Sequence, residues 1–200
     1  MSIALRNKFI ACFLLILFIT PMLGAGIMYF TGKGIPHKTV NHGALINPPL
    51  AFKALNLPSL GHSQTERPMK LDAKWLLLYV NPQPCEQQCL DTLYKIRQTH
   101  TALNKDSDRL VRVLLATQPL SSQLQQRITQ TYPGTEYYPV SQAVLTSFLA
   151  NSPFSTETLS TGRLYVVDPL GNVMMTYPLD IGFEPLLSDL KRLLQLSQIG

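Results

Sequence analysis

The chain has 200 residues, room for one domain or for one domain with an appendage, and three cysteines, too few for a disulfide-dense mini-protein. Charged residues make up only 14% of it, fewer than in an ordinary soluble domain, and a single apolar run accounts for much of the difference. No second apolar run approaches the length needed to cross a bilayer, which excludes a membrane protein with several spans. The net charge of +5 comes from scattered basic residues, none in a run that would bind a phosphate backbone, so we expect no nucleic-acid partner.

The apolar run at 9–29 is long enough to cross a bilayer, and a membrane helix tolerates the proline within it. No clear signal-peptide cleavage site follows, so we expect that residues 1–30 form an uncleaved anchor rather than a cleaved signal peptide. Arg6 and Lys8 on the short N-terminal side predict that the N-terminus is cytoplasmic. We therefore expect a single-pass protein of the cytoplasmic (inner) membrane, with its C-terminal domain in the periplasm.

Residues 31–70 are dense in glycine and proline, and a helix cannot persist through so many breakers. We predict a Pro/Gly-rich spacer here, with a short extended piece around 44–46. The spacer separates the anchor from a folded domain that we place at residues 71–200.

The domain is predicted to begin with a strand at 75–80, a continuous apolar run of the kind that is buried on both faces. The pattern then turns helical from Cys85 to about Leu103. The later elements follow the same reading of periodicity, caps and turns. They are a strand at 110–116, helices at 121–131 and 141–150, strands at 163–168 and 173–177 flanking a turn, and a helix at 184–196. This order predicts an α/β, thioredoxin-like fold, a central mixed sheet with helices on both faces, preceded by the N-terminal transmembrane helix.

Cys85 and Cys89 lie directly after the first predicted core strand, at the start of the first helix. Residues four apart on a helix share a face, so a disulfide suits the pair. The spacing also suits two thiolates on one soft metal ion such as Cu(I). The helix N-terminus favours the thiolate of Cys85, whereas Glu86 acts in the opposite direction. Cys12 lies in the apolar run, where membrane packing explains it.

Three segments resemble the Sco (SenC/PrrC) type of thioredoxin-like proteins, which carry C-x-x-x-C after the first core strand. One is the anchor, the second is YVNPQPCEQQC at 79–89, and the third is LYVVDPLG at 164–171, similar to that family's YLLDPxG hairpin. In addition, NHGALI at 41–46 resembles a piece that follows the anchor in short proteins found with cytochrome oxidase genes in proteobacteria. The resemblance covers about residues 5–198.

Sco-type proteins deliver copper to cytochrome c oxidase or reduce its copper-site cysteines. The resemblance therefore implies an oxidase subunit as partner. In thiol–disulfide exchange, Cys85 would attack the partner's disulfide and Cys89 would resolve the mixed disulfide. In copper handling, both cysteines would bind the metal ion. That family also has a proline after each cysteine and a histidine before the hairpin strand as third copper ligand. Here Pro84 precedes the first cysteine, and the ligand position falls near Ser160, with no histidine after His100.

No other histidine is expected to complete a metal site or to act as a base beside the cysteines. His100 lies roughly 16 Å along the helix from Cys89, and we expect it at the surface. His37, His42 and His62 lie in the predicted spacer, where we expect exposure to solvent.

Two methionines and a proline are further candidates for the site. We expect one of Met174 and Met175 to pack in the core. Pro153 is nearest to the position of the cis-proline in thioredoxin-type enzymes, yet it lies ten residues before Arg163, so this element is predicted to be absent or displaced.

Three functions are compatible with these residues. The first is a membrane-anchored Sco-like factor that assists assembly of the oxidase copper centre by thiol–disulfide exchange or Cu(I) handling. The second is a general periplasmic thiol–disulfide oxidoreductase, and the third is a non-catalytic thioredoxin-fold scaffold with a structural disulfide. In the first two, Cys85 and Cys89 are the reacting residues.

Overall fold

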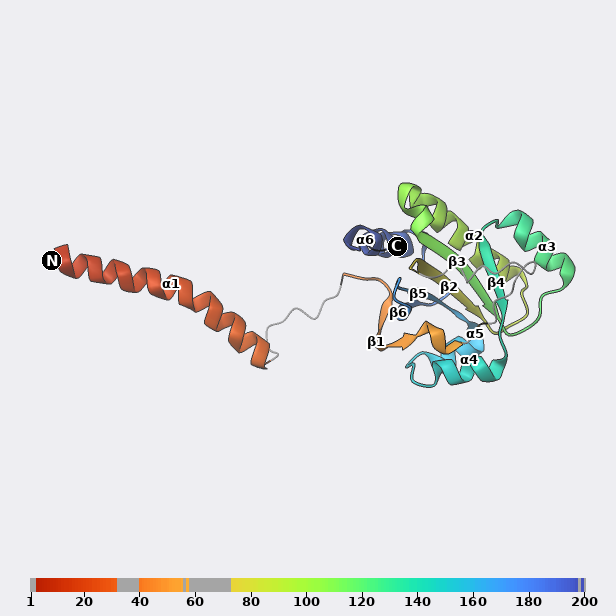
Figure 1. Cartoon of the computed structure of the whole chain (residues 1–200), viewed down its shortest axis with the longest axis horizontal. Helices are drawn as coiled ribbons and strands as arrows, with labels where there is room; N and C mark the ends of the chain where they lie inside the picture. The colour runs from red at the N-terminus through yellow and green to blue at the C-terminus, as the bar shows by residue number, and fades with distance from the viewer. Residues whose placement is uncertain (1–2, 32–39, 56, 58–72, 198, 200) are drawn as a thin grey trace. The chain divides into compact units, whose positions relative to one another are not determined.

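The structure, a computed structural model, describes residues 3–31, 40–55, 57, 73–197 and 199. The chain divides into two compact units, Met1–Val40 and Asn41–Gly200 (Figure 1). The first unit contains helix α1 (Ile3–Thr31). Its stretch Arg6–Thr31 has a mean hydropathy of 2.4, and among the described residues it is the one helix long and apolar enough to cross a membrane.

The second unit is built on a six-stranded mixed sheet in the order β1-β6-β5-β2-β3-β4. Strands β2, β3 and β4 are parallel to one another, and β5, β6 and β1 continue the sheet with antiparallel pairing. The strands are β1 (Ala44–Ala51), β2 (Trp75–Asn81), β3 (Leu110–Ala116), β4 (Thr135–Pro139), β5 (Arg163–Val167) and β6 (Asn172–Tyr177).

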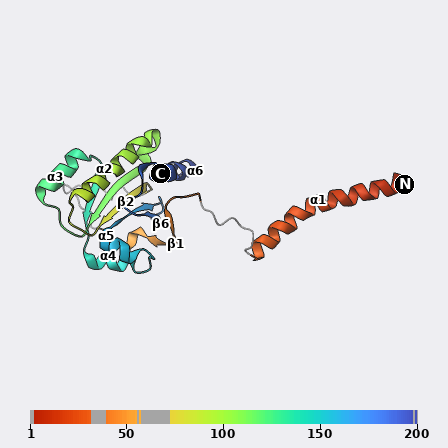
Figure 2. The ribbon, with the colours of Figure 1, turned by 180° about the vertical axis from the view of Figure 1, so that it is seen from behind.

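Helices cover both faces of this sheet (Figure 1, Figure 2). They are α2 (Gln87–Ala102), α3 (Ser122–Thr131), α4 (Gln142–Leu149), α5 (Ser155–Thr161) and α6 (Phe183–Leu196), with 3-10 turns η1 (Phe52–Leu55) and η2 (Asn104–Arg109). The core under α2, α3 and α6 takes Leu77 and Tyr79 from β2, and the core under α4 and η1 takes Leu76 and Leu78. The predicted strand buried on both faces, and with it the thioredoxin-like arrangement, is thereby confirmed.

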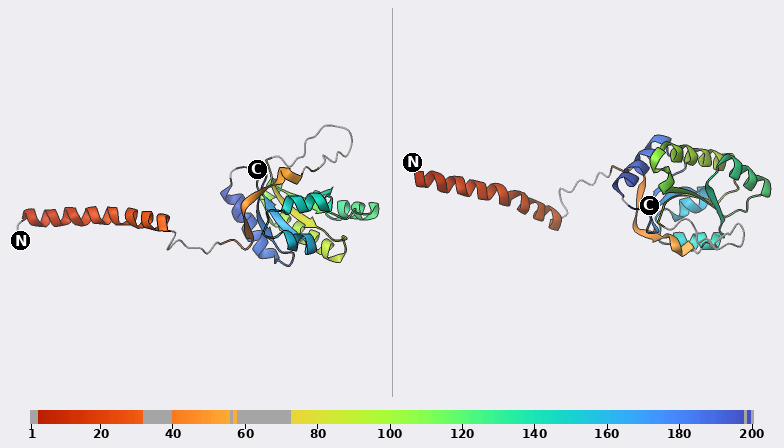
Figure 3. Two further views of the ribbon diagram at one scale, coloured as in Figure 1. Left: turned by 90° about the horizontal axis from the view of Figure 1, so that it is seen from below. Right: turned by 45° about the horizontal axis from the view of Figure 1, so that its top comes forward.

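The segment expected as a spacer contributes the strand β1 to the sheet. This strand pairs only with β6 and lies at the opposite edge of the sheet from β4 (Figure 3). Pro48 and Pro49 fit there because an edge strand needs ladder hydrogen bonds on one side only, and the register shifts between Leu45 and Leu50. The compact unit thus includes Asn41–Leu55, ahead of the boundary that we predicted at residue 71.

Serines cap two of the predicted helices. The Ser121 side chain accepts a hydrogen bond from the Leu124 N–H, and that of Ser141 accepts one from the Val144 N–H, each at 3.3 Å. Strand β4 and helix α5 were not predicted. Both are short, and α5 (STETLST) has a single apolar residue, so neither shows a periodic apolar pattern.

Candidate functional site

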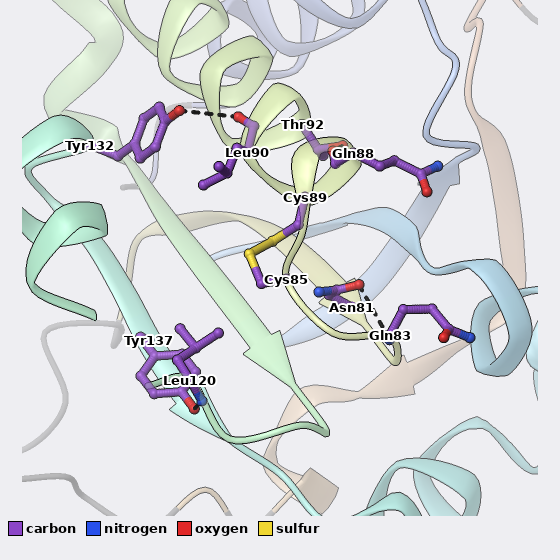
Figure 4. Close-up of a disulfide and its surroundings, with 10 residues drawn as sticks. All are labelled: Asn81, Gln83, Cys85, Gln88, Cys89, Leu90, Thr92, Leu120, Tyr132 and Tyr137. Carbon is purple, nitrogen blue, oxygen red and sulfur yellow. Dashed lines mark hydrogen bonds between the residues drawn. A yellow bond between two sulfur atoms is a disulfide. The ribbon is translucent and has the colours of Figure 1, made fainter. Parts of the chain in front are cut away.

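Cys85 and Cys89 are joined by a disulfide, with their Cα atoms 5.0 Å apart (Figure 4). Cys89 lies in the first turn of α2 and is only 2% exposed. Cys85 lies before the helix, is partly exposed, and packs against the same core. The two sulfurs therefore differ in access, and Cys85 is the one that another molecule can reach.

Helix α2 begins at Gln87, two residues later than predicted, so that Cys85 lies in the preceding loop. Proline at 82 and 84 favours an extended chain before each of these positions, which delays the helix. Glu86 takes the N-cap position in an extended conformation, and its N–H donates to the Pro84 carbonyl at 2.9 Å. A Cys85 thiolate exists only in the reduced protein, and its stabilisation by the N-terminus of α2 stays a prediction.

The loop before Cys85 is tied to its neighbours on two sides. Thr117 donates its N–H to the Asn81 carbonyl at 3.2 Å and its hydroxyl to the Pro82 carbonyl at 2.8 Å. On the other side, the Gln83 amide donates to the Ser160 carbonyl at 2.8 Å. The loop is thus held between the end of β3 and the end of helix α5, where the chain turns into β5.

That turn depends on Gly162, which immediately precedes β5. Its φ is +84°, and a Cβ built there would lie 2.6 Å from the Val80 carbonyl oxygen and 3.1 Å from Cδ of Pro82. Only glycine allows the backbone to come this close to the end of β2 in this conformation.

Apolar and aromatic side chains surround the disulfide on the side of α3 and β4 (Figure 4). The Tyr132 hydroxyl donates to the Leu90 carbonyl at 3.2 Å, and the Leu120 N–H donates to the Tyr137 hydroxyl at 3.3 Å. These contacts fix the two tyrosines, so the site has an apolar and aromatic wall on this side.

The predicted position of a third copper ligand holds Ser160, whose hydroxyl donates to the Glu157 carbonyl at 3.0 Å. Over the part of the chain that the structure describes, no three His, Cys, Asp or Glu residues gather as a metal site would require. Met175 is buried, with its sulfur 2.8 Å from the Tyr177 hydroxyl oxygen, while Met174 is partly buried against the same core. One of the two methionines thus packs in the core, as predicted.

The histidines differ in part from expectation. His100 is half-buried rather than at the surface: its Nε2 lies 3.1 Å from the Leu110 carbonyl oxygen, and burial together with the charge of Arg112 lowers its pKa. His42 is half-exposed, in agreement with the expected exposure to solvent, and it is also bonded to Asp189. His37 and His62 lie outside the described residues.

The cis-proline of thioredoxin-type enzymes is not found before β5. Within the described ranges the only cis peptide bond is Asn47–Pro48, in β1, so Pro153 does not serve as that element. Gly162 occupies the turn that leads into β5 instead.

Residues 75–197 match the protein-family model described as the transmembrane-like, thioredoxin-like, C-terminal domain. A comparison with curated proteins found no match. Among solved structures, similar ones include copper-bound ScoI of Arabidopsis thaliana, at 15% identity and a TM-score of 0.51, with 64% of this chain and 88% of that chain covered.

Two further structures share the fold at similar distance. Copper-bound yeast Sco1 is 12% identical with a TM-score of 0.51, over 64% of this chain and 82% of that chain. The third structure is BsSco, a member of the Sco family of cytochrome c oxidase assembly proteins in which a disulfide switch was identified. It is 13% identical with a TM-score of 0.50, over 80% of this chain and 98% of that chain. At these identities the likeness shows a common thioredoxin-like fold.

Proposed function

Since the chain belongs to the family of transmembrane-like, thioredoxin-like C-terminal domains, we propose that it is a Sco-like factor that assists assembly of the copper centre of cytochrome c oxidase. It acts by thiol–disulfide exchange through Cys85 and Cys89. The fold shared with BsSco, a member of a family of oxidase assembly proteins, supports this proposal.

The unequal exposure of the two cysteines is the observation that carries the proposal. In the reduced protein, the thiolate of the accessible Cys85 attacks a disulfide of the partner and releases one partner thiolate. The thiol of the buried Cys89 then gives its proton to the released partner thiolate, and its sulfur attacks the Cys85 sulfur and releases the second partner thiolate. Two electrons pass to the partner, and the Cys85–Cys89 disulfide forms.

The partner in this proposal is an oxidase subunit whose copper-site cysteines have become oxidised. Helix α1 would confine the domain to the inner membrane, with the domain in the periplasm, where thiols are oxidised and an assembling copper site needs a reductant. A dithiol of the same compartment must then reduce the Cys85–Cys89 disulfide again before another cycle.

Cu(I) handling is the second candidate, favoured by the copper-bound Arabidopsis and yeast structures. The reduced pair offers two thiolates four residues apart, and soft thiolates select Cu(I). The residues fit copper as a two-sulfur cargo but not as a three-ligand site, because no third ligand among the described residues gathers with the cysteines. Since the disulfide has no thiolate, copper would bind only after reduction.

The test is oxidase assembly in cells that carry Cys85→Ser, Cys89→Ser or both, with Cys12→Ser as the matched control. We expect the double variant to lose oxidase activity while the copper-site cysteines of the subunit stay oxidised. Cys89→Ser should trap a mixed disulfide between Cys85 and that subunit, and Cys85→Ser should trap none. Normal assembly in the double variant would refute the proposal.

The two alternatives predict other outcomes of the same experiment. A general oxidoreductase would trap many unrelated periplasmic proteins through Cys85 rather than one subunit. A structural disulfide would make the double variant unstable and give no mixed disulfide in either single variant.

A further inference from the structure

A buried amide lies at the disulfide. Asn81 is the last residue of β2 and is 3% exposed. Alternate residues of β2 face the same side, and Leu77 and Tyr79 face the core against which both cysteines pack, so Asn81 points to that side as well. Figure 4 shows the amide next to Cys85.

The orientation of this amide is fixed by one hydrogen bond. The Gln83 N–H donates to Oδ1 of Asn81 at 3.4 Å, so Oδ1 must face the backbone and Nδ2 must face away from it. In Figure 4 the nitrogen is turned to the side of Cys85. Nδ2 is buried and has no hydrogen-bond partner within the described part of the chain.

An unpaired buried donor of this kind is rare, because nearly all buried polar atoms in folded proteins have a partner. Two other buried nitrogens share this condition, those of Trp75 and Arg112. Trp75 lies at the opposite end of β2, and the guanidinium of Arg112 already donates to the Pro133 carbonyl. Asn81 alone lies at the cysteines, where the sulfur changes charge during the reaction.

We propose that Nδ2 of Asn81 donates a hydrogen bond to the Cys85 thiolate in the reduced protein, and so favours the anionic, reduced state of the pair. The inference deepens the proposed thiol–disulfide exchange and rests on it for its biological meaning. A disulfide sulfur is a poor acceptor, whereas a thiolate is a strong, charge-assisted one. The donor is therefore unpaired in the disulfide form and paired after reduction.

The redox step is balanced by a dithiol reductant. The reductant supplies two electrons and two protons and leaves as a disulfide, while the bond between the two protein sulfurs breaks. One proton stays on Cys89 as a thiol, and the other passes from Cys85 to water, which leaves the thiolate that Asn81 binds.

The experiment compares Asn81→Leu, which keeps the volume but removes the donor, with Thr117→Val, which loosens the same loop and leaves the amide intact. Each full-length protein in detergent is reduced with dithiothreitol, separated from it, and alkylated with iodoacetamide over a pH series. Fragmentation mass spectrometry locates the label at Cys85. The midpoint of the rate against pH is the pKa of its thiol.

We expect the midpoint to rise by about one pH unit in Asn81→Leu, which means about tenfold less thiolate below the midpoint. At a pH above both midpoints, the equilibrium constant for reduction by glutathione should fall about tenfold, equivalent to about 30 mV. Thr117→Val should leave the midpoint unchanged. Asn81→Ala has a smaller side chain that cannot overpack the site, and we expect it to shift the midpoint by the same amount. It replaces Asn81→Leu in the experiment if the leucine variant does not fold.

An unchanged midpoint in a folded Asn81 variant would overturn the inference, and so would an equal rise in Thr117→Val. The readout uses iodoacetamide and glutathione, not the oxidase. Normal oxidase assembly in the double cysteine variant would therefore refute the proposed function while leaving the shift at Cys85 measurable.

Discussion

Asp189 in the middle of α6 binds His42, which precedes β1, although 147 positions separate the two residues in sequence. Oδ2 of Asp189 accepts the N–H of His42 at 2.8 Å and that of Gly43 at 3.0 Å, and Oδ1 lies 3.1 Å from Nδ1 of the His42 ring. The Tyr177 hydroxyl donates to Oδ2 at 3.1 Å. One buried carboxylate thus fastens the first residues of the compact unit to its last helix.

Replacing this carboxylate should destabilise the domain. In Asp189→Asn the amide NH₂ would face backbone N–H donors, so at least one buried donor loses its acceptor. We expect the free energy of unfolding to fall by about 3 kcal/mol. Urea titration of the full chain measures it. Glu184→Gln, an exposed carboxylate in the same helix, should cost less than about 1 kcal/mol, and equal losses would contradict the role of burial.

The same carboxylate makes stability depend on acid. Burial alone would raise the pKa of Asp189, but the hydrogen bonds from Gly43, His42 and Tyr177 lower it below its ordinary value. A depressed pKa in the folded state stabilises the fold above the unfolded value of about 3.9, and this contribution is lost as the pH falls further. Asp189→Asn should therefore flatten the stability profile below about pH 4. A variant curve parallel to that of the wild type would exclude this linkage.

The sequence predicts most of this fold because its strongest signals are local. The apolar run of β2, the serine caps and the leucines of α6 each depend on neighbours within one element. The bond between His42 and Asp189 joins segments that are distant in sequence. The sequence contains one indication of it, because Asp189 is an acidic residue on the buried face of an amphipathic helix, beside Leu186 and Leu190. The edge strand β1 was predicted only as a short extended piece around 44–46, because its prolines signal a loop, although an edge strand can hold them.

The site was predicted in part for the same reason. The spacing of Cys85 and Cys89 is local, and the structure joins them. The unpaired amide of Asn81 and the bond from Gln83 to Ser160 depend on how the end of β2, the loop after it and the end of α5 meet, which no periodic pattern encodes.

Gly162→Ala should be more harmful than an ordinary loop substitution. The new Cβ would lie 2.6 Å from the Val80 carbonyl at a positive φ, so strain and a backbone clash act together. Gly171→Ala is the matched control, because Gly171 has a φ of +85° but nothing within 4 Å of a built Cβ. We expect about 1 kcal/mol of lost stability in the control and at least twice that in Gly162→Ala. Equal urea midpoints for the two variants would show that the turn can move away from β2.

The missing third copper ligand can be supplied by Ser160→His. The side-chain amide of Gln83, two residues before Cys85, donates to the Ser160 carbonyl, so position 160 lies near the end of α5, in contact with the cysteine loop. An imidazole there would add a nitrogen donor to the two thiolates of the reduced protein, and imidazole and thiolate both bind copper well. We expect the reduced variant to hold Cu(I) more tightly than the wild type against a chromogenic chelator.

Gln142→His is the control, because α4 packs on the opposite face of the sheet from the cysteines and a histidine there cannot reach them. If Ser160→His and Gln142→His bind Cu(I) alike, then position 160 is not the missing ligand position, and copper handling by this chain would depend on two sulfurs alone.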